Sequence, residues 1–96
     1  MRKSLQQKAL TDIIKKFGSN HQMDLAIEEC SELIKAINKH RRMPSHETFT
    51  NLYEEIADVE IMCQQLRLIF NNDQTINKIK ASKMERIEFI LKSSRP

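Results

Sequence analysis

Residues 26–37 read AIEECSELIKAI, and residues 51–62 read NLYEEIADVEIM. In both stretches apolar residues recur three and four positions apart, which is the spacing of an amphipathic α-helix. Each stretch also carries two acidic residues, three positions apart, inside or beside its apolar stripe. The two stretches therefore predict a pair of helices that pack together with carboxylates in their shared face.

The first acidic pair is Glu29 and Glu32. At about 100° of turn per residue, Glu29 lies between Leu33 and Ala36, inside the apolar stripe, and Glu32 lies at its margin. Glu28 falls on the opposite, polar side of the same helix. The pattern predicts that Glu29 points toward the packed face while Glu28 stays in water.

The second stretch repeats this arrangement. Glu55 lies between Val59 and Met62 on the helical projection, and Asp58 lies at the margin of the stripe. A short loop joins the two helices, so we expect them to pack antiparallel and to bring both acidic pairs to one cleft.

Four carboxylates in one cleft repel one another unless a cation lies among them. Ligands that are all oxygen, without His or Cys, select a hard ion, so the expected cofactor is Mg²⁺, with Mn²⁺ as the alternative. The competing interpretation is structural: each acidic pair forms salt bridges with nearby Lys or Arg side chains.

The remaining chain also reads as helical. We expect one domain, residues 1–96, that is all-α and forms an antiparallel four-helix bundle. Its helices are predicted at about 4–17, 20–40, 48–70 and 74–91. Gly18 suits a helix end with positive φ, and Thr48 or Thr50 suits the start of the third helix.

Composition excludes several classes. The 96 residues include one Gly, two Pro and one Tyr, too few for a β-sandwich, a phosphate-binding glycine loop or a base-stacking platform. A net charge of +3 is a weak excess, so we do not expect a nucleic-acid partner. No signal peptide or membrane-spanning run is visible, and Cys30 and Cys63 are expected as buried, reduced thiols in a cytoplasmic protein.

The fourth predicted helix carries basic residues within its apolar arc. Lys80 and Lys83 lie between its isoleucines on the projection, and Arg86 lies at the edge of the arc. Such groups can neutralise the carboxylates or hold the phosphates of a ligand. The alternative is that their stems lie on the core surface while the charged groups stay in water.

The order of these motifs resembles a known family. Glu-Glu-x-x-Glu at 28–32, followed after 22 residues by Glu-x-x-Asp at 55–58, resembles the signature of the MazG-like all-α nucleoside triphosphate pyrophosphohydrolases. The sequence HQM at 21–23 and the Lys-x-x-Arg helix at 83–91 are similar to the surrounding parts of that family. The resemblance covers about residues 5–91.

The resemblance implies Mg²⁺-dependent hydrolysis of a nucleoside triphosphate between its α and β phosphates. The implied metal ligands are Glu29, Glu32, Glu55 and Asp58. Glu29 would also orient or deprotonate the attacking water, and Lys83 and Arg86 would hold phosphate oxygens during catalysis. Candidates for contact with the rest of the substrate are Phe17, His21, Gln22, Tyr53 and Lys80.

The resemblance also implies a homodimer or homotetramer. An apolar strip formed by Ala57, Ile61 and Leu68 faces away from the predicted carboxylate cleft and suggests a partner surface. Two other interpretations stay open: a phosphoribosyl-ATP pyrophosphohydrolase-like enzyme, and a non-catalytic helical regulator that binds nucleotides or nucleic acid.

Overall fold

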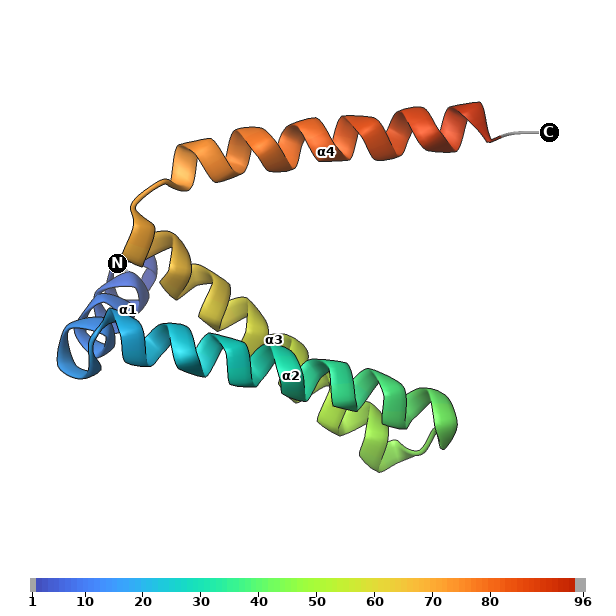
Figure 1. Ribbon diagram of the computed structural model, residues 1–96, viewed down its shortest axis with the longest axis horizontal. Coiled ribbons are helices and arrows are strands. Elements are labelled where there is room, and N and C mark those ends of the chain that lie inside the picture. Colours follow the sequence, from blue (N-terminus) through green and yellow to red (C-terminus); the bar gives the residue numbers. More distant parts are fainter. Residues whose placement is uncertain (1, 95–96) are drawn as a thin grey trace.

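The computed structural model describes residues 2–94, and within them it contains four α-helices and no strand. They are α1 (Arg2–Phe17), α2 (Ser19–Arg42), α3 (His46–Phe70) and α4 (Asp73–Ser93). Each helix begins and ends within two residues of the predicted position. The expected all-α fold is confirmed, and Figure 1 shows how the helices are arranged.

The helix ends follow local chemistry. Gly18 has φ 93° between α1 and α2, a conformation that disfavours a side chain, as predicted. The prediction that Thr48 or Thr50 begins α3 is wrong, because Ser45 is the N-cap. The Ser45 hydroxyl accepts a hydrogen bond from the Thr48 amide at 3.1 Å, and the Thr48 hydroxyl accepts one from the Ser45 amide at 2.8 Å.

Helices α2 and α3 form an antiparallel hairpin with a constant register. The Gln22 amide donates to the Gln65 carbonyl oxygen at 2.7 Å, deep between the two helices. Seven residues further along α2 and seven back along α3, Glu29 meets Asp58. Near the loop, His40 Nδ1 lies 2.8 Å from the Thr48 hydroxyl. This register places the two acidic pairs opposite one another in the middle of the hairpin.

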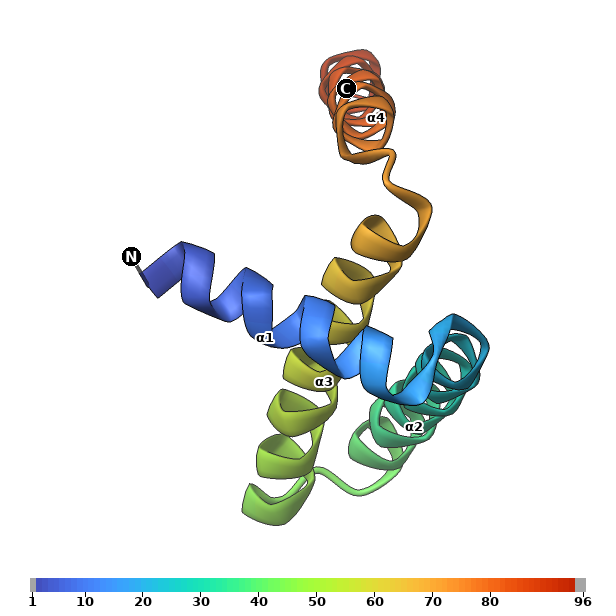
Figure 2. The same cartoon turned by 90° about the vertical axis from the view of Figure 1, so that its left-hand side faces the viewer.

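Helix α1 crosses the other end of the hairpin. It contacts both α2 and α3, and Figure 2 shows it lying across α3 near the beginning of α2. Leu10 and Ile14 are its most buried apolar side chains among those described. The three helices α1, α2 and α3 therefore form one packed unit.

Helix α4 does not join that unit, which corrects the prediction of four mutually packed helices. In the described part of the chain it contacts α3 alone, and every α4 side chain except Ile76 is exposed. Asn71, in the left-handed conformation with φ 51°, redirects the chain, and Arg67 on α3 binds Asp73 and Asn77 at the start of α4. Figure 1 shows α4 extending away from the hairpin.

Few side chains are fully buried. The buried apolar residues are Ala26, Ala36 and Met62, whereas many large apolar side chains are exposed. Cys30 and Cys63, expected in the core, are exposed free thiols. Their helical faces are apolar, but nothing in the described chain covers them. No helix in residues 2–94 has the length and apolar character needed to cross a lipid bilayer.

Candidate metal centre

Three carboxylates converge in the middle of the α2–α3 hairpin. Glu29 comes from α2, and Glu55 and Asp58 come from α3. One oxygen from each lies within 4.8 Å of the others. The i, i+3 spacing puts Glu55 and Asp58 on one face of α3, and the antiparallel register brings Glu29 opposite them. The sequence predicted this convergence.

The triad lies partly inside the helix packing. Glu29 and Glu55 are half-buried, and Asp58 is exposed. Partial burial raises the pKa of Glu29, and the charge of Asp58, a hydrogen bond with Asp58 and the charges of Glu55 and Glu32 raise it further. Partial burial likewise raises the pKa of Glu55, with the charges of Asp58, Glu32 and Glu54 adding to it. A cation bound nearby would favour the charged form of both groups.

No basic side chain among those described compensates the triad. Among the described side chains the ion pairs are Lys8–Asp12, Lys35–Glu32 and Arg67–Asp73, and none of them includes a triad member. Glu55 Oε2 is buried and has no hydrogen-bond partner. A buried carboxylate oxygen without a donor is costly, so this atom identifies a position where a cation would be favourable.

Glu32 differs from the other predicted ligands. It is exposed, and its Oε1 lies 3.5 Å from Lys35 Nζ, one turn along α2. It is not part of the close triad, although its charge contributes to the raised pKa of Glu29 and Glu55. An exposed i, i+3 ion pair is weak, so Glu32 can exchange Lys35 for a nearby cation at little cost.

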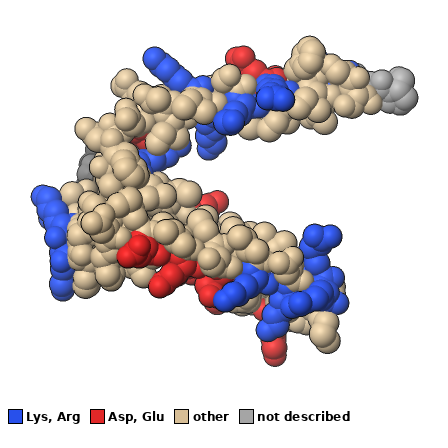
Figure 3. All heavy atoms as spheres, in the orientation of Figure 1, with Lys and Arg blue, Asp and Glu red and all other residues tan. Residues whose placement is uncertain are grey.

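The donor set suits a hard divalent cation. All donors are carboxylate oxygens, as Mg²⁺ and Mn²⁺ prefer, and no described His or Cys joins the triad. Figure 3 shows acidic side chains gathered on one side of the α2–α3 hairpin, while basic side chains lie at the loop end of the hairpin, on the α1 side and on α4.

The basic residues of α4 do not reach the triad. Lys80, Lys83 and Arg86 are all exposed, on a helix that touches only α3. The expectation that they face the carboxylates within one chain is wrong, because the turn at Asn71 sends α4 away from the hairpin.

The residues predicted to contact the substrate do not form one pocket. Phe17 and His21 stack with ring centroids 5.3 Å apart beside the start of α2. Tyr53 is 62% exposed and lies beside Phe49, nearer the loop end of the hairpin. The α2–α3 register places Tyr53 level with Ile34 of α2, which is 13 residues beyond His21. This separation corresponds to about 20 Å along the helix. These aromatic groups are therefore too far apart to hold the same ring.

Gln22 has a structural position. It is only 1% exposed and uses its amide to bind Gln65, while its carbonyl oxygen accepts from the ring of His21 at 2.8 Å. Gln65 is equally enclosed and donates to the Met62 sulfur at 3.6 Å. The Gln22 side chain is thus engaged in joining α2 to α3 and is not free to bind a ligand.

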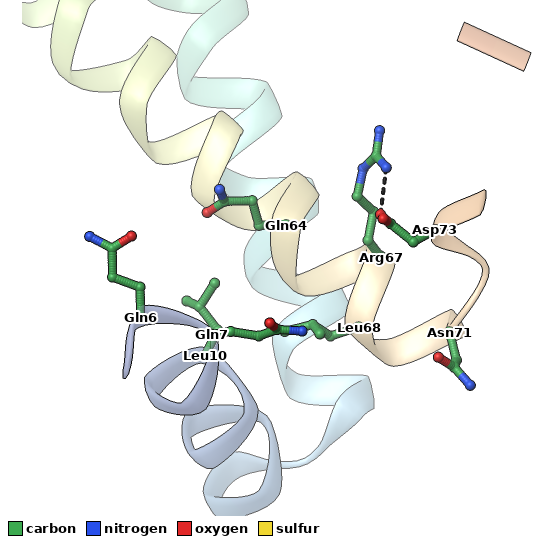
Figure 4. A pocket seen from close by; sticks show the side chains of 8 residues that line it. All are labelled: Gln6, Gln7, Leu10, Gln64, Arg67, Leu68, Asn71 and Asp73. Carbon is green, nitrogen blue, oxygen red and sulfur yellow. Dashed lines mark hydrogen bonds and ion pairs between the residues drawn. The ribbon is translucent and has the colours of Figure 1, made fainter. Parts of the chain in front are cut away.

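Sequence reasoning missed an open pocket between α1 and the end of α3. It has a volume of about 420 Å³, and Figure 4 shows its lining side chains. The lining residues are Gln6, Gln7, Leu10, Gln64, Arg67, Leu68, Asn71 and Asp73. Four of these carry amides, which no motif signals because the pocket combines two helices distant in sequence. Gln64 lies six residues along α3 from Asp58, a rise of about 9 Å.

Comparison of the chain with models of known protein families, with curated proteins and with solved structures finds no match.

Proposed function

We propose that this protein is a Mg²⁺-dependent nucleoside triphosphate pyrophosphohydrolase. One observation carries the proposal: Glu29, Glu55 and Asp58 converge to within 4.8 Å, and among the described side chains they have no basic partner and a buried oxygen of Glu55 has no hydrogen bond. If these carboxylates had only a structural role away from water, they would need to pair with Lys or Arg. A site that binds a cation therefore explains the arrangement better.

Glu29, Glu55 and Asp58 would hold the cation, with Glu32 joining after it releases Lys35. The bound Mg²⁺ would supply charge neutralisation for the phosphate oxygens and for the departing pyrophosphate. Phosphoryl transfer needs little covalent help from a protein, which mainly positions charges and an in-line water. A cluster of carboxylates on two rigid helices suits that task.

The proposed reaction breaks the bond between the oxygen that bridges the α and β phosphates and one of its phosphorus atoms. Water attacks that phosphorus, and Glu29 receives a proton from the water. The products are a nucleoside monophosphate and pyrophosphate. We assign Glu29 the role of general base because it is half-buried and lies opposite Asp58, next to the position that the cation would occupy.

Lys83 and Arg86 require a different position of α4 to take part. We propose that they hold phosphate oxygens when α4 lies over a carboxylate cluster, either of its own chain or of a second copy. The amide-lined pocket beside α1 is the better candidate for the base, because its glutamine and asparagine side chains can form hydrogen bonds with a nucleobase.

The test is pyrophosphate release from a panel of ribo- and deoxyribonucleoside triphosphates with Mg²⁺, with phosphoribosyl-ATP included. We expect release from at least one of them, and a loss of about 10²–10⁴-fold in Glu29→Gln. Glu55→Gln should lose activity as well. Glu28→Gln is the matched control, because Glu28 neighbours Glu29 on α2 but is exposed.

Absence of release from every nucleotide, or full activity in both triad variants, would refute the catalytic proposal. Release from phosphoribosyl-ATP alone would assign the related activity instead. Stabilisation of the wild-type protein by Mg²⁺ plus nucleotide without any release would identify a nucleotide-binding regulator.

A further inference from the structure

The pocket between α1 and the end of α3 has the size and lining of a small-molecule site. Its volume of about 420 Å³ falls within the usual range for such sites, which combine apolar walls with a few polar groups. Leu10 of α1 and Leu68 of α3 are half-buried and form its apolar part. The pocket and the carboxylate triad share no described residue, so ligand binding to the pocket can be measured without a metal on the triad.

The pocket also contains an ion pair with unused hydrogen-bonding groups. Arg67 uses Nη1 to bind both Asp73 and Asn77, which holds its guanidinium beside the start of α4. Its Nε–H and Nη2–H groups donate to no described residue. Asp73 accepts through Oδ1, and its Oδ2 accepts from no described residue. A ligand in the pocket therefore meets N–H donors beside a free carboxylate oxygen.

Four amide side chains complete the lining, two from α1 and two from the end of α3 and the turn that follows it. Figure 4 shows Gln64 directed toward α1, with Arg67 and Asp73 side by side on the other side of the pocket. An amide both donates and accepts hydrogen bonds, so these four groups suit either kind of partner. The selective groups are Arg67, which only donates, and Asp73, which only accepts while it is ionised.

We propose that this pocket binds a guanine ring, which Arg67 and Asp73 distinguish from the other bases. Guanine offers two neighbouring acceptors, N7 and O6, and a bidentate contact from Arg to this pair is the commonest specific contact in DNA recognition. The N1–H of guanine lies beside O6 and can donate to Asp73 Oδ2. Leu10 and Leu68 supply apolar contact for the ring. The role of this ring as part of the substrate rests on the proposed function, whereas its binding does not.

The other bases match these two groups less well. Adenine carries an amino group where guanine has O6, and an unprotonated nitrogen where guanine has N1–H, so it sets a donor against Arg67 and a lone pair against Asp73. Cytosine has the same reversal at N4 and N3. Uracil matches through O4 and N3–H, but its smaller ring has no N7. The expected order of affinity is guanine, then uracil, then adenine and cytosine.

The test is an NMR titration of the full chain with the four nucleoside monophosphates GMP, UMP, AMP and CMP, in EDTA so that no metal is bound. Binding should shift the side-chain amide signals of the Gln and Asn residues that line the pocket. One bidentate contact discriminates between bases by roughly tenfold or more, so GMP should bind at least tenfold more tightly than AMP. UMP should lie between them. Ribose 5-phosphate carries the sugar and phosphate without a base, and it should leave these signals unchanged.

A variant locates the discrimination at one side chain. Arg67→Met keeps an aliphatic stem and removes the donors, so it should bring the affinity for GMP close to that for AMP. The affinity for AMP should change less than twofold, which a general loss of structure would not produce. Arg41→Met is the matched control, because Arg41 is exposed at the end of α2 and does not line this pocket. This variant should keep the preference for GMP.

Four results with the wild-type protein would overturn the proposal: no binding of GMP, equal affinity for AMP, tighter binding of UMP than of GMP, or the same shifts with ribose 5-phosphate. An undiminished preference for GMP in Arg67→Met would overturn it as well. Failure of the catalytic proposal looks different. Binding of GMP without pyrophosphate release from any triphosphate would refute the catalytic proposal alone, and release without binding of GMP in the pocket would refute the guanine site alone.

Discussion

The hydrogen bond between Gln22 and Gln65 is the contact whose removal should affect both stability and the carboxylate site. Both side chains are almost fully buried, at 1% and 4% exposure, and the bond spans 2.7 Å between α2 and α3. Leucine has nearly the volume of glutamine, so Gln22→Leu removes the bond without opening a large cavity. It also leaves the carbonyl oxygen of Gln65 buried without a donor.

The expected cost follows from that unpaired oxygen. A buried polar group that loses its partner costs about 1–3 kcal/mol, so each of Gln22→Leu and Gln65→Leu should lower the free energy of unfolding by about 2 kcal/mol. Replacing both residues removes both polar groups together, and the double variant should lie within about 1 kcal/mol of wild type. His21 is exposed, so it can exchange its contact with Gln22 for water.

The assay is urea unfolding followed by circular dichroism at a fixed protein concentration, with all four proteins compared in a double-mutant cycle. The coupling energy should be about 3 kcal/mol. Strictly additive losses would refute the reasoning, because they would mean that the two amides contribute independently. The bond also sets the register seven residues from Glu29 and Asp58, so Mg²⁺ should raise the melting temperature less in either single variant than in wild type.

Three further outcomes are expected. Because the pKa values of Glu29 and Glu55 are raised, the folded metal-free protein binds their protons more tightly than the unfolded chain does. Its melting temperature in EDTA should therefore fall as pH rises from the ordinary glutamate pKa through the raised values, and it should fall less in the double variant Glu29→Gln/Glu55→Gln. In Gly18→Ala the added methyl group meets no neighbouring atom, but it stands on a residue with φ 93°, so urea unfolding should show a loss of about 1–2 kcal/mol in the free energy of unfolding. An unchanged unfolding midpoint would contradict the inference that a side chain is strained at this position. Ser45→Ala removes the acceptor for the Thr48 amide and should cost about 1 kcal/mol in the same assay, whereas an unaltered stability would mean that the cap contributes nothing.

The sequence predicted the helices and the triad well because both depend on local periodicity. The positions of Glu29, Glu55 and Asp58 relative to their apolar neighbours already set which way they point, and a short loop leaves the two helices little choice but to pack antiparallel. The pairing of Glu32 with Lys35 was harder to foresee, since an exposed side chain has several neighbours within reach.

The position of α4 and the role of Gln22 could not be predicted in the same way. A helical projection shows that a face is apolar, but it does not show whether the same chain or another copy covers it. This is why Lys83 and Arg86 were expected beside the carboxylates, and why Cys30 was expected to be buried. Gln22 reads as polar and available in sequence, and only its hydrogen bond to Gln65 reveals that it is a core residue.

The isolation of α4 has a consequence for how the protein melts. A helix of 21 residues that contacts the rest of the described chain only near its start is marginally stable in water, because most of its stability comes from local propensity. Its backbone amides beyond the first turn should therefore exchange with solvent deuterium far faster than those of α2 and α3, and its helicity should decline gradually with temperature. Slow exchange along α4 in the intact protein would show directly that another surface holds this helix.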